Sequence, residues 1–148
     1  MEELNYEKLF HEIEKKLRSE KSMILATCAD DKVTARMVSH INDGLTVLFS
    51  TNRNSQKAEQ MRRNANIALA IDNMNIEAAA ELFGHPGGHV FFQRAYPKKF
   101  PLFAKLYPDT PEDMLVIARP VKITLFKYSK GACWDVLETD GKKAYRLT

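Results

Sequence analysis

The stretch that decides the fold is residues 34–64, which read TARMVSHINDGLTVLFSTNRNSQKAEQMRRN. It holds most of one apolar run (33–41) and all of a second (45–50), separated by the turn signal Asn-Asp-Gly. A polar loop then leads into a helical pattern that begins after Ser55, a residue type that favours the N-cap. The order predicts strand, turn, strand, loop and helix, with the two strands paired as a hairpin.

The same stretch concentrates groups that bind anions. Arg36 stands alone in the first apolar run, and alternation along a strand puts it on one face with Thr34 and Val38. The loop of residues 50–57 adds hydroxyls and a lysine at a helix start. Singly, these features are typical of a solvated arginine and a helix cap. Their order and spacing favour a site for a phosphate monoester dianion.

The rest of the chain predicts a mainly β protein. Many short strands joined by turn signals are typical of an antiparallel barrel with peripheral helices. The 148 residues suit a single domain, 1–148. Strands are expected at 23–27, 33–41, 45–50, 67–72, 76–83, 114–119, 121–128, 133–137 and 143–147, and helices at 5–19, 55–64 and within 89–107.

Bulk properties exclude several classes of protein. The 22 basic and 19 acidic residues leave a net charge of +3, and the basic residues are scattered, so no nucleic-acid partner is expected. No apolar run approaches the ~20 residues that span a bilayer, and the N-terminus does not resemble a signal peptide. Two distant cysteines fit reduced thiols. We expect a cytoplasmic protein with no membrane partner.

The histidines do not predict a metal site. His85 and His89 flank a Pro-Gly-Gly segment with no third ligand nearby, so a loop with incidental histidines is the better interpretation and no metal is expected. His40 shares a face with Arg36, and either an approach to a cofactor or a packed strand histidine fits it equally. No Ser-His-Asp or Cys-His arrangement is present, so the catalytic residues are unknown.

Three motifs in register carry a family resemblance. They are Arg36-Met37-Val38-Ser39, Phe49-Ser50-Thr51-Asn52 and Ser55-Gln56-Lys57. Together they resemble the cofactor segment of the pyridoxamine 5′-phosphate oxidase-like FMN-binding split barrels, and residues 120–128 resemble a later strand of that family more loosely. The resemblance implies one antiparallel split β-barrel domain of the FMN-binding type.

The resemblance also implies roles for individual residues. Arg36 and Lys57 would pair with the FMN phosphate, Arg36 through its planar fork and Lys57 as a point charge. The backbone of Met37, Val38 and Ser39 would lie along the isoalloxazine edge. The remaining cofactor-binding positions implied by the motifs are Ser50, Thr51, Ser55, Gln56 and Phe126.

Departures from the family pattern limit what the resemblance implies. Gln56 stands where oxidase members carry a second arginine, which removes one charge from the phosphate site. Phe126 stands where they have a tryptophan, and Arg146 matches their terminal arginine only faintly. The residues that grip pyridoxal phosphate are not recognisable, so a true pyridoxamine phosphate oxidase is not expected. Residues 84–111 are the expected place for specificity.

The function implied is that of a flavin-dependent oxidoreductase. It would be a homodimer holding non-covalent FMN at its interface, with a small-molecule substrate and NAD(P)H as a candidate electron donor. The alternative is a non-enzymatic flavin or haem binder, or a sensor, on the same fold, because a fold does not determine a function.

Overall fold

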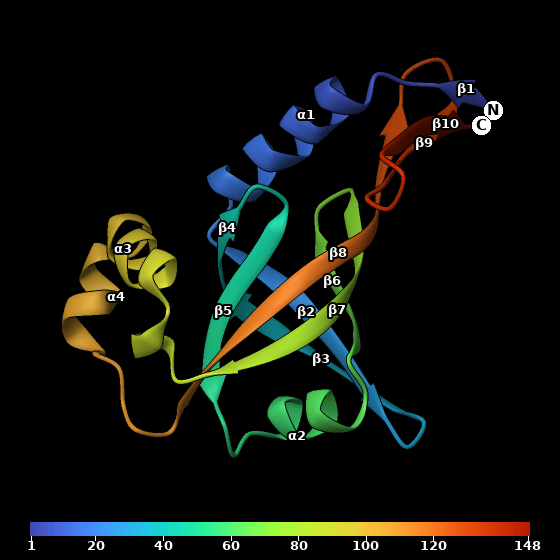
Figure 1. The fold of residues 1–148 in the computed structure, drawn as a ribbon. Coiled ribbons are helices and arrows are strands. Elements are labelled where there is room, and N and C mark those ends of the chain that lie inside the picture. The colour runs from blue at the N-terminus through green and yellow to red at the C-terminus, as the bar shows by residue number, and fades with distance from the viewer.

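The computed structural model describes all residues 1–148 and confirms the predicted antiparallel split barrel with peripheral helices (Figure 1). The elements in chain order are β1 (Glu2–Glu3), α1 (Tyr6–Ser19), β2 (Ser22–Ala29), β3 (Lys32–Ser39), β4 (Ile41–Asp43), β5 (Thr46–Asn52), α2 (Gln56–Arg63), β6 (Asn66–Ile71), β7 (Met74–Gly84), the 3₁₀ turn η1 (Pro86–Gly88), α3 (Val90–Lys99), α4 (Pro101–Leu106), β8 (Asp113–Tyr128), β9 (Ala132–Glu138) and β10 (Lys143–Leu147).

The segment predicted as one strand at 33–41 is divided in the structure, which leaves the barrel open beside it. It is two strands, β3 and β4, and only β4 forms the hairpin with β5. β3 instead pairs with β2 along its whole length, with Leu25 opposite Arg36. The predicted hairpin between 33–41 and 45–50 is therefore wrong for β3. The second edge of β3 pairs with no strand, although β5 lies close by.

Two apolar clusters explain why β8 begins with an uninterrupted buried run. Met114, Val116 and Ala118 face the main core inside the barrel. Leu115 and Ile117 face a second cluster, where they pack with aromatic side chains from α3 and its C-terminal end. Because side chains alternate along a strand, a strand covered on both faces reads as continuously hydrophobic.

β8 also corrects a second prediction. The segments expected as separate strands on either side of Pro120 are one strand of 16 residues. The register with β7 shifts between Glu77 and Ala78: Glu77 lies opposite Lys122, and Ala78 lies opposite Pro120. Val121 is thus the extra residue of a β-bulge, which tolerates a proline that cannot donate to the ladder.

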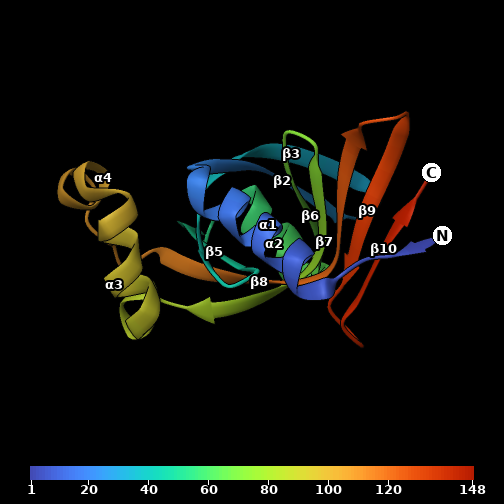
Figure 2. The same ribbon diagram turned by 90° about the horizontal axis from the view of Figure 1, so that it is seen from above.

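The helices lie around the barrel in distinct places. α1 covers one end and α2 the other (Figure 1). Seen from above, α3 and α4 lie at the opposite side of the molecule from β9 and β10 (Figure 2). α1 begins after Asn5, whose side chain accepts a 2.9 Å hydrogen bond from the Lys8 backbone, and it buries Leu9, Ile13 and Leu17. None of the helices has the length and hydrophobicity needed to cross a membrane.

An ion network ties the C-terminal strands to α1. Asp135 on β9 is 3% exposed and lies 2.8 Å from Lys127 Nζ on β8. Arg146 on β10 donates to both oxygens of the Asp135 carboxylate, at 2.7 and 3.0 Å. Lys127 also pairs with Glu12 of α1 at 2.8 Å. Three strands therefore meet at one buried carboxylate, and Lys127 connects them to α1.

Candidate functional site

Arg36 is held in a fixed orientation by neutral acceptors. Its Nη1 donates to the backbone oxygen of Leu25 at 3.2 Å and to Thr27 Oγ1 at 2.8 Å. Its Nη2 donates to Thr34 Oγ1 at 2.5 Å. These bonds use three of the five N–H groups of the guanidinium, which leaves Nε–H and one Nη2–H without a protein acceptor. The two free donors lie on one edge of the guanidinium, the arrangement that binds two oxygens of a phosphate.

Gln60 on α2 completes this arrangement. It is 7% exposed, and its Oε1 accepts from Thr27 at 2.6 Å and from Thr34 at 2.7 Å. Its Nε2 donates to the backbone oxygen of Lys32 at 3.3 Å. Sequence reasoning missed Gln60 and Thr27 as site residues. No local pattern in the sequence distinguishes either residue from an exposed polar side chain.

Lys57 lies near Arg36 at the start of α2. Burial and then the charge of Arg36 lower the pKa of Lys57, and burial lowers the pKa of Arg36. Every ion pair in the molecule involves other residues, so no carboxylate neutralises either cation. Two partly buried, unpaired cations at a helix N-terminus are the groups that an anion requires.

The loop before α2 supplies the predicted hydroxyls. Ser55 is the N-cap, as predicted: its Oγ accepts from the Ala58 backbone at 3.3 Å. Thr51 is 7% exposed, and its Oγ1 lies 3.3 Å from Ser55 Oγ. Ser50 is half-buried at the end of β5, and Gln56 is exposed in the first turn of the helix. No hydrogen bond joins Arg36 to Thr51.

The predicted backbone segment lies on the free edge of the sheet. Val38 is buried, whereas Met37 and Ser39 are exposed on the other face of β3. The edge of β3 that does not pair with β2 meets no other strand, so the peptide groups along that edge are open to a ligand. A planar molecule with donors and acceptors on its rim fits such an edge.

Phe126 and Arg146 lie away from this cluster within one chain. Phe126 is 42% exposed near the end of β8, where it meets Trp134 edge to face at 5.6 Å. Its backbone N–H donates to Asn73 in the β6–β7 turn. Arg146 belongs to the ion network of Asp135. The protomer therefore does not bring either residue to Arg36 and Lys57.

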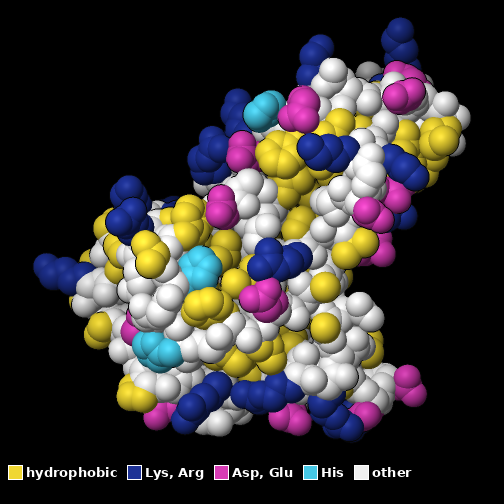
Figure 3. Space-filling model, viewed as in Figure 1, with side chains coloured by type: hydrophobic (Ala, Val, Ile, Leu, Met, Phe, Trp, Pro, Cys, Tyr) yellow, Lys and Arg dark blue, Asp and Glu magenta, His cyan; other side chains and the backbone are white.

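The surface around α2 carries charges of both signs. On the face seen in Figure 3, Lys and Arg side chains are interspersed with Asp and Glu along the edge formed by α2. Pairs such as Arg62–Glu59 and Arg63–Asp30 account for this pattern. On this face the two signs of charge therefore alternate and form no continuous basic stripe (Figure 3).

His40 is a packed histidine. It is 0% exposed, and its Nε2 lies 3.0 Å from the backbone oxygen of Leu17 near the end of α1. Its Nδ1 has no hydrogen-bond partner. Lys99 donates to the same Leu17 oxygen at 3.3 Å. Burial, and next the charge of Lys99, lowers the pKa of His40 to about 4.

This pKa predicts acid sensitivity. The native pKa is below the ordinary value of 6.5, so the unfolded chain binds more protons between these pH values. The His40 contribution is complete above pH 6.5 and is lost as the pH falls towards 4, by about 3 kcal/mol. Urea unfolding at pH 7 and pH 4.5 should show His40→Gln losing less stability than the parent protein. His11→Gln, at an exposed position, should keep the parental loss, and an equal loss in His40→Gln would contradict the assignment.

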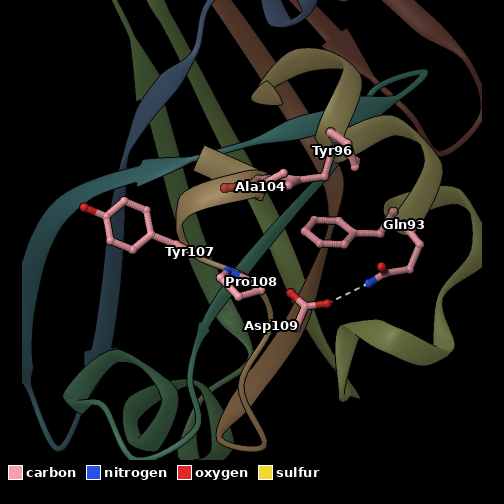
Figure 4. Close-up of a pocket in the computed structure, with 8 residues that line it drawn as sticks. Gln93, Tyr96, Ala104, Tyr107, Pro108 and Asp109 are labelled. Atoms are coloured by element: carbon pink, nitrogen blue, oxygen red, sulfur yellow. Dashed lines mark hydrogen bonds between the residues drawn. The ribbon is translucent and has the colours of Figure 1, made fainter. Parts of the chain in front are cut away.

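A cavity of about 240 Å³ lies in the segment expected to set specificity. Its lining includes Phe92, Tyr96 and Asp109. Gln93 and Asp109 face each other there, joined by a 3.0 Å hydrogen bond, whereas the Tyr107 ring points away from Tyr96 (Figure 4). None of the hydrogen bonds of Arg36 involves a residue that lines this cavity.

His85 and His89 form hydrogen bonds with backbone groups. His85 accepts from the Gly87 backbone at 3.0 Å and contacts the Thr110 oxygen at 2.8 Å. His89 accepts from the Phe92 backbone at 3.1 Å, which caps α3. No group of three or more His, Cys, Asp or Glu side chains is arranged to hold a metal ion.

Comparisons with known proteins agree with this architecture. The family model described as pyridoxamine 5′-phosphate oxidase matches residues 9–93. A search of curated proteins finds no match.

Three solved structures are similar in fold. ChuZ of Campylobacter jejuni is 17% identical over 97% of this chain and 64% of its own, with a TM-score of 0.75. A pyridoxamine 5′-phosphate oxidase-related, FMN-binding protein of Nostoc punctiforme is 14% identical over 95% of this chain and 93% of its own, with a TM-score of 0.64. An FAD-binding protein of Mesorhizobium loti is 13% identical over 76% of this chain and 90% of its own, with a TM-score of 0.60.

Proposed function

Because this chain belongs to the pyridoxamine 5′-phosphate oxidase family, we propose that it binds FMN without a covalent bond and acts as an oxidoreductase on a small molecule. Similar structures are described as FMN-binding and FAD-binding, which supports a flavin as the cofactor. The single observation that carries the proposal is the pair of unneutralised cations, Arg36 and Lys57, beside the free edge of β3.

The charge of this pair favours FMN over a dinucleotide. FMN ends in a phosphate monoester, which is close to a dianion at neutral pH, whereas the phosphates of FAD are bridging and carry one charge each. A site with two cations and a free Arg36 edge matches the dianion best. Gln56 is exposed beside Lys57, and its amide offers hydrogen-bond donors but no charge.

A homodimer would complete the site. The outer face of β2 and β3 carries three exposed apolar side chains: Ile24 at 45%, Val33 at 70% and Met37 at 60%. The pairing of Ile24 with Met37 makes two of them neighbours, on the face opposite Arg36. Such a patch on a single chain is typical of an association surface. We assign it to contact with a second copy of the chain. Phe126 lies far from the site of its own protomer, and in the dimer it would reach the flavin bound by the other protomer.

The residues of this chain then have distinct tasks. Arg36 and Lys57 bind the phosphate, and the backbone of β3 orients the ring. The flavin supplies hydride or electron transfer when it is bound. No side chain of the site is required as a general acid, because the flavin performs the redox step.

The test is made on the purified protein. We expect a yellow protein with one FMN per chain and a mass in solution near twice 16.9 kDa. Anaerobic addition of NADH or NADPH should bleach the flavin absorbance if a nicotinamide is the electron donor. Retention of the colour with both nicotinamides would favour the alternative, a non-enzymatic flavin binder. A colourless protein that takes up no added FMN would refute the proposal.

A further inference from the structure

The acceptors around Arg36 differ from those of the other arginines in the chain. Five of the seven other arginines pair with a carboxylate: Arg18, Arg62, Arg63, Arg119 and Arg146. Arg36 binds two hydroxyls and a backbone oxygen, all of them neutral. A carboxylate there would hold the guanidinium equally well but would cancel its charge. Neutral acceptors fix its position and leave the full charge to a ligand.

The two hydroxyls accept from Arg36 with their lone pairs while their own protons are directed elsewhere. A threonine hydroxyl has one proton and two lone pairs. Thr27 and Thr34 both donate that proton to Gln60 Oε1, at 2.6 and 2.7 Å. Their lone pairs then point to Arg36. Without this common acceptor, one hydroxyl would donate to the other, which lies 3.3 Å away, or to water, and the two lone-pair sets would no longer be fixed together towards Arg36.

Gln60 is itself fixed in one orientation. Its Nε2 donates to the Lys32 backbone oxygen at 3.3 Å, so its Oε1 must face the two threonines. The same helix carries Lys57 one turn earlier, so Gln60 also connects the helix of the lysine with the strand of the arginine. Because Gln60 is 7% exposed, water does not compete for these bonds.

We propose that Gln60 is a positioning residue of the phosphate site: through Thr27 and Thr34 it keeps the Nε and Nη2 edge of Arg36 directed at the cofactor phosphate. This inference rests on the proposed function, since it concerns the same anion. It adds that the site depends on an uncharged amide at residue 60, which neither contacts the phosphate nor bears a charge.

The experiment compares the affinities of FMN and riboflavin, which differ only in the phosphate. In the parent protein FMN should bind more tightly. Gln60→Glu places a negative charge behind Arg36 and opposes the Lys32 oxygen, so the ratio of the two affinities should fall about tenfold. Gln60→Leu removes the common acceptor, and the ratio should fall about threefold. Riboflavin affinity should stay at the parental value in both variants.

Three further measurements separate positioning from folding. Lys130→Gln changes the net charge as Gln60→Glu does, at an exposed turn, and should leave the ratio at the parental value. Thr34→Val, at a half-buried position, should lower the ratio as Gln60→Leu does, and Thr34→Ser should restore it. Urea unfolding of the flavin-free variants shows whether each one is folded at the assay temperature.

The outcomes separate the two proposals. A parent protein that binds riboflavin as tightly as FMN, or binds neither, refutes the phosphate site itself. In the other outcome the parent prefers FMN clearly, and Gln60→Glu, Gln60→Leu and Thr34→Val all keep that preference. This result refutes the role of Gln60 but not the phosphate site.

Discussion

The double variant Arg36→Ala/Lys57→Ala is expected to lose about 10²- to 10⁴-fold in FMN affinity. Each cation offers a charge-assisted hydrogen bond worth about 1.5–3 kcal/mol, and tenfold in affinity corresponds to about 1.4 kcal/mol. The loss should be specific to the phosphate, so riboflavin should bind the variant and the parent alike. A fluorescence titration with each flavin measures both affinities.

The flavin-free double variant should remain folded, with a stability close to that of the parent. Neither cation has a carboxylate partner, and both have lowered pKa values in the folded state, so the relief of desolvation and mutual repulsion offsets the three hydrogen bonds lost with Arg36. Arg94→Ala/Lys98→Ala removes two exposed cations from α3 and serves as the control of equal charge. Stoichiometric FMN at parental affinity in Arg36→Ala/Lys57→Ala would contradict the phosphate assignment.

Asp135→Asn is expected to lower the free energy of unfolding by about 3–5 kcal/mol. Removal of one partner from a buried ion pair leaves the others uncompensated, which costs about this much. Asp135 is 3% exposed between Lys127 and Arg146, so asparagine keeps the shape but leaves Arg146 without a carboxylate partner and Lys127 with Glu12 alone. Urea unfolding at pH 7 measures the loss. Glu81→Gln, which breaks the exposed pair with Arg119, should cost at most about 1 kcal/mol.

The pH dependence of this network has a definite sign. The hydrogen bond from Arg146 is the main cause that lowers the pKa of Asp135, so the folded state binds its proton less readily than the unfolded chain. The contribution of Asp135 is therefore complete above the ordinary carboxyl pKa and is lost as the pH falls below it. An unfolding free energy of Asp135→Asn within about 1 kcal/mol of the parent, the size of an exposed ion pair, would show that the network adds little.

The sequence predicted which side chains share a face of a strand better than it predicted which strands pair with each other. Alternation correctly placed Thr34, Arg36 and Val38 on one side of a strand, and Ser55 was correctly predicted as a helix cap. Alternation does not say which strand lies alongside, so the pairing of β3 with β2 could not be foreseen. Pro120 suggested a break between two strands. The bulge that accommodates this proline within β8 depends on the register with β7, which the sequence of β8 alone does not show.

Gln60 and Thr27 could not be predicted as site residues for a similar reason. Gln60 and Thr27 lie 33 residues apart, and nothing local marks either one as polar and buried. Their hydrogen bonds become visible only once α2 is packed against β2. Sequence motifs identified the charged residues that we propose for the phosphate, whereas the residues that support them depend on tertiary structure.

The position of β8 has a consequence for how the chain folds. This one strand pairs with β5, β7 and β9, which lie on both sides of it in the sequence. Contacts between distant segments slow folding, because the intervening chain must be ordered before they form. During synthesis β5 and β7 must therefore wait, with open edges, until β8 emerges. Premature association of those edges competes with closure, so the rate of β8 docking should govern the yield of correctly folded protein.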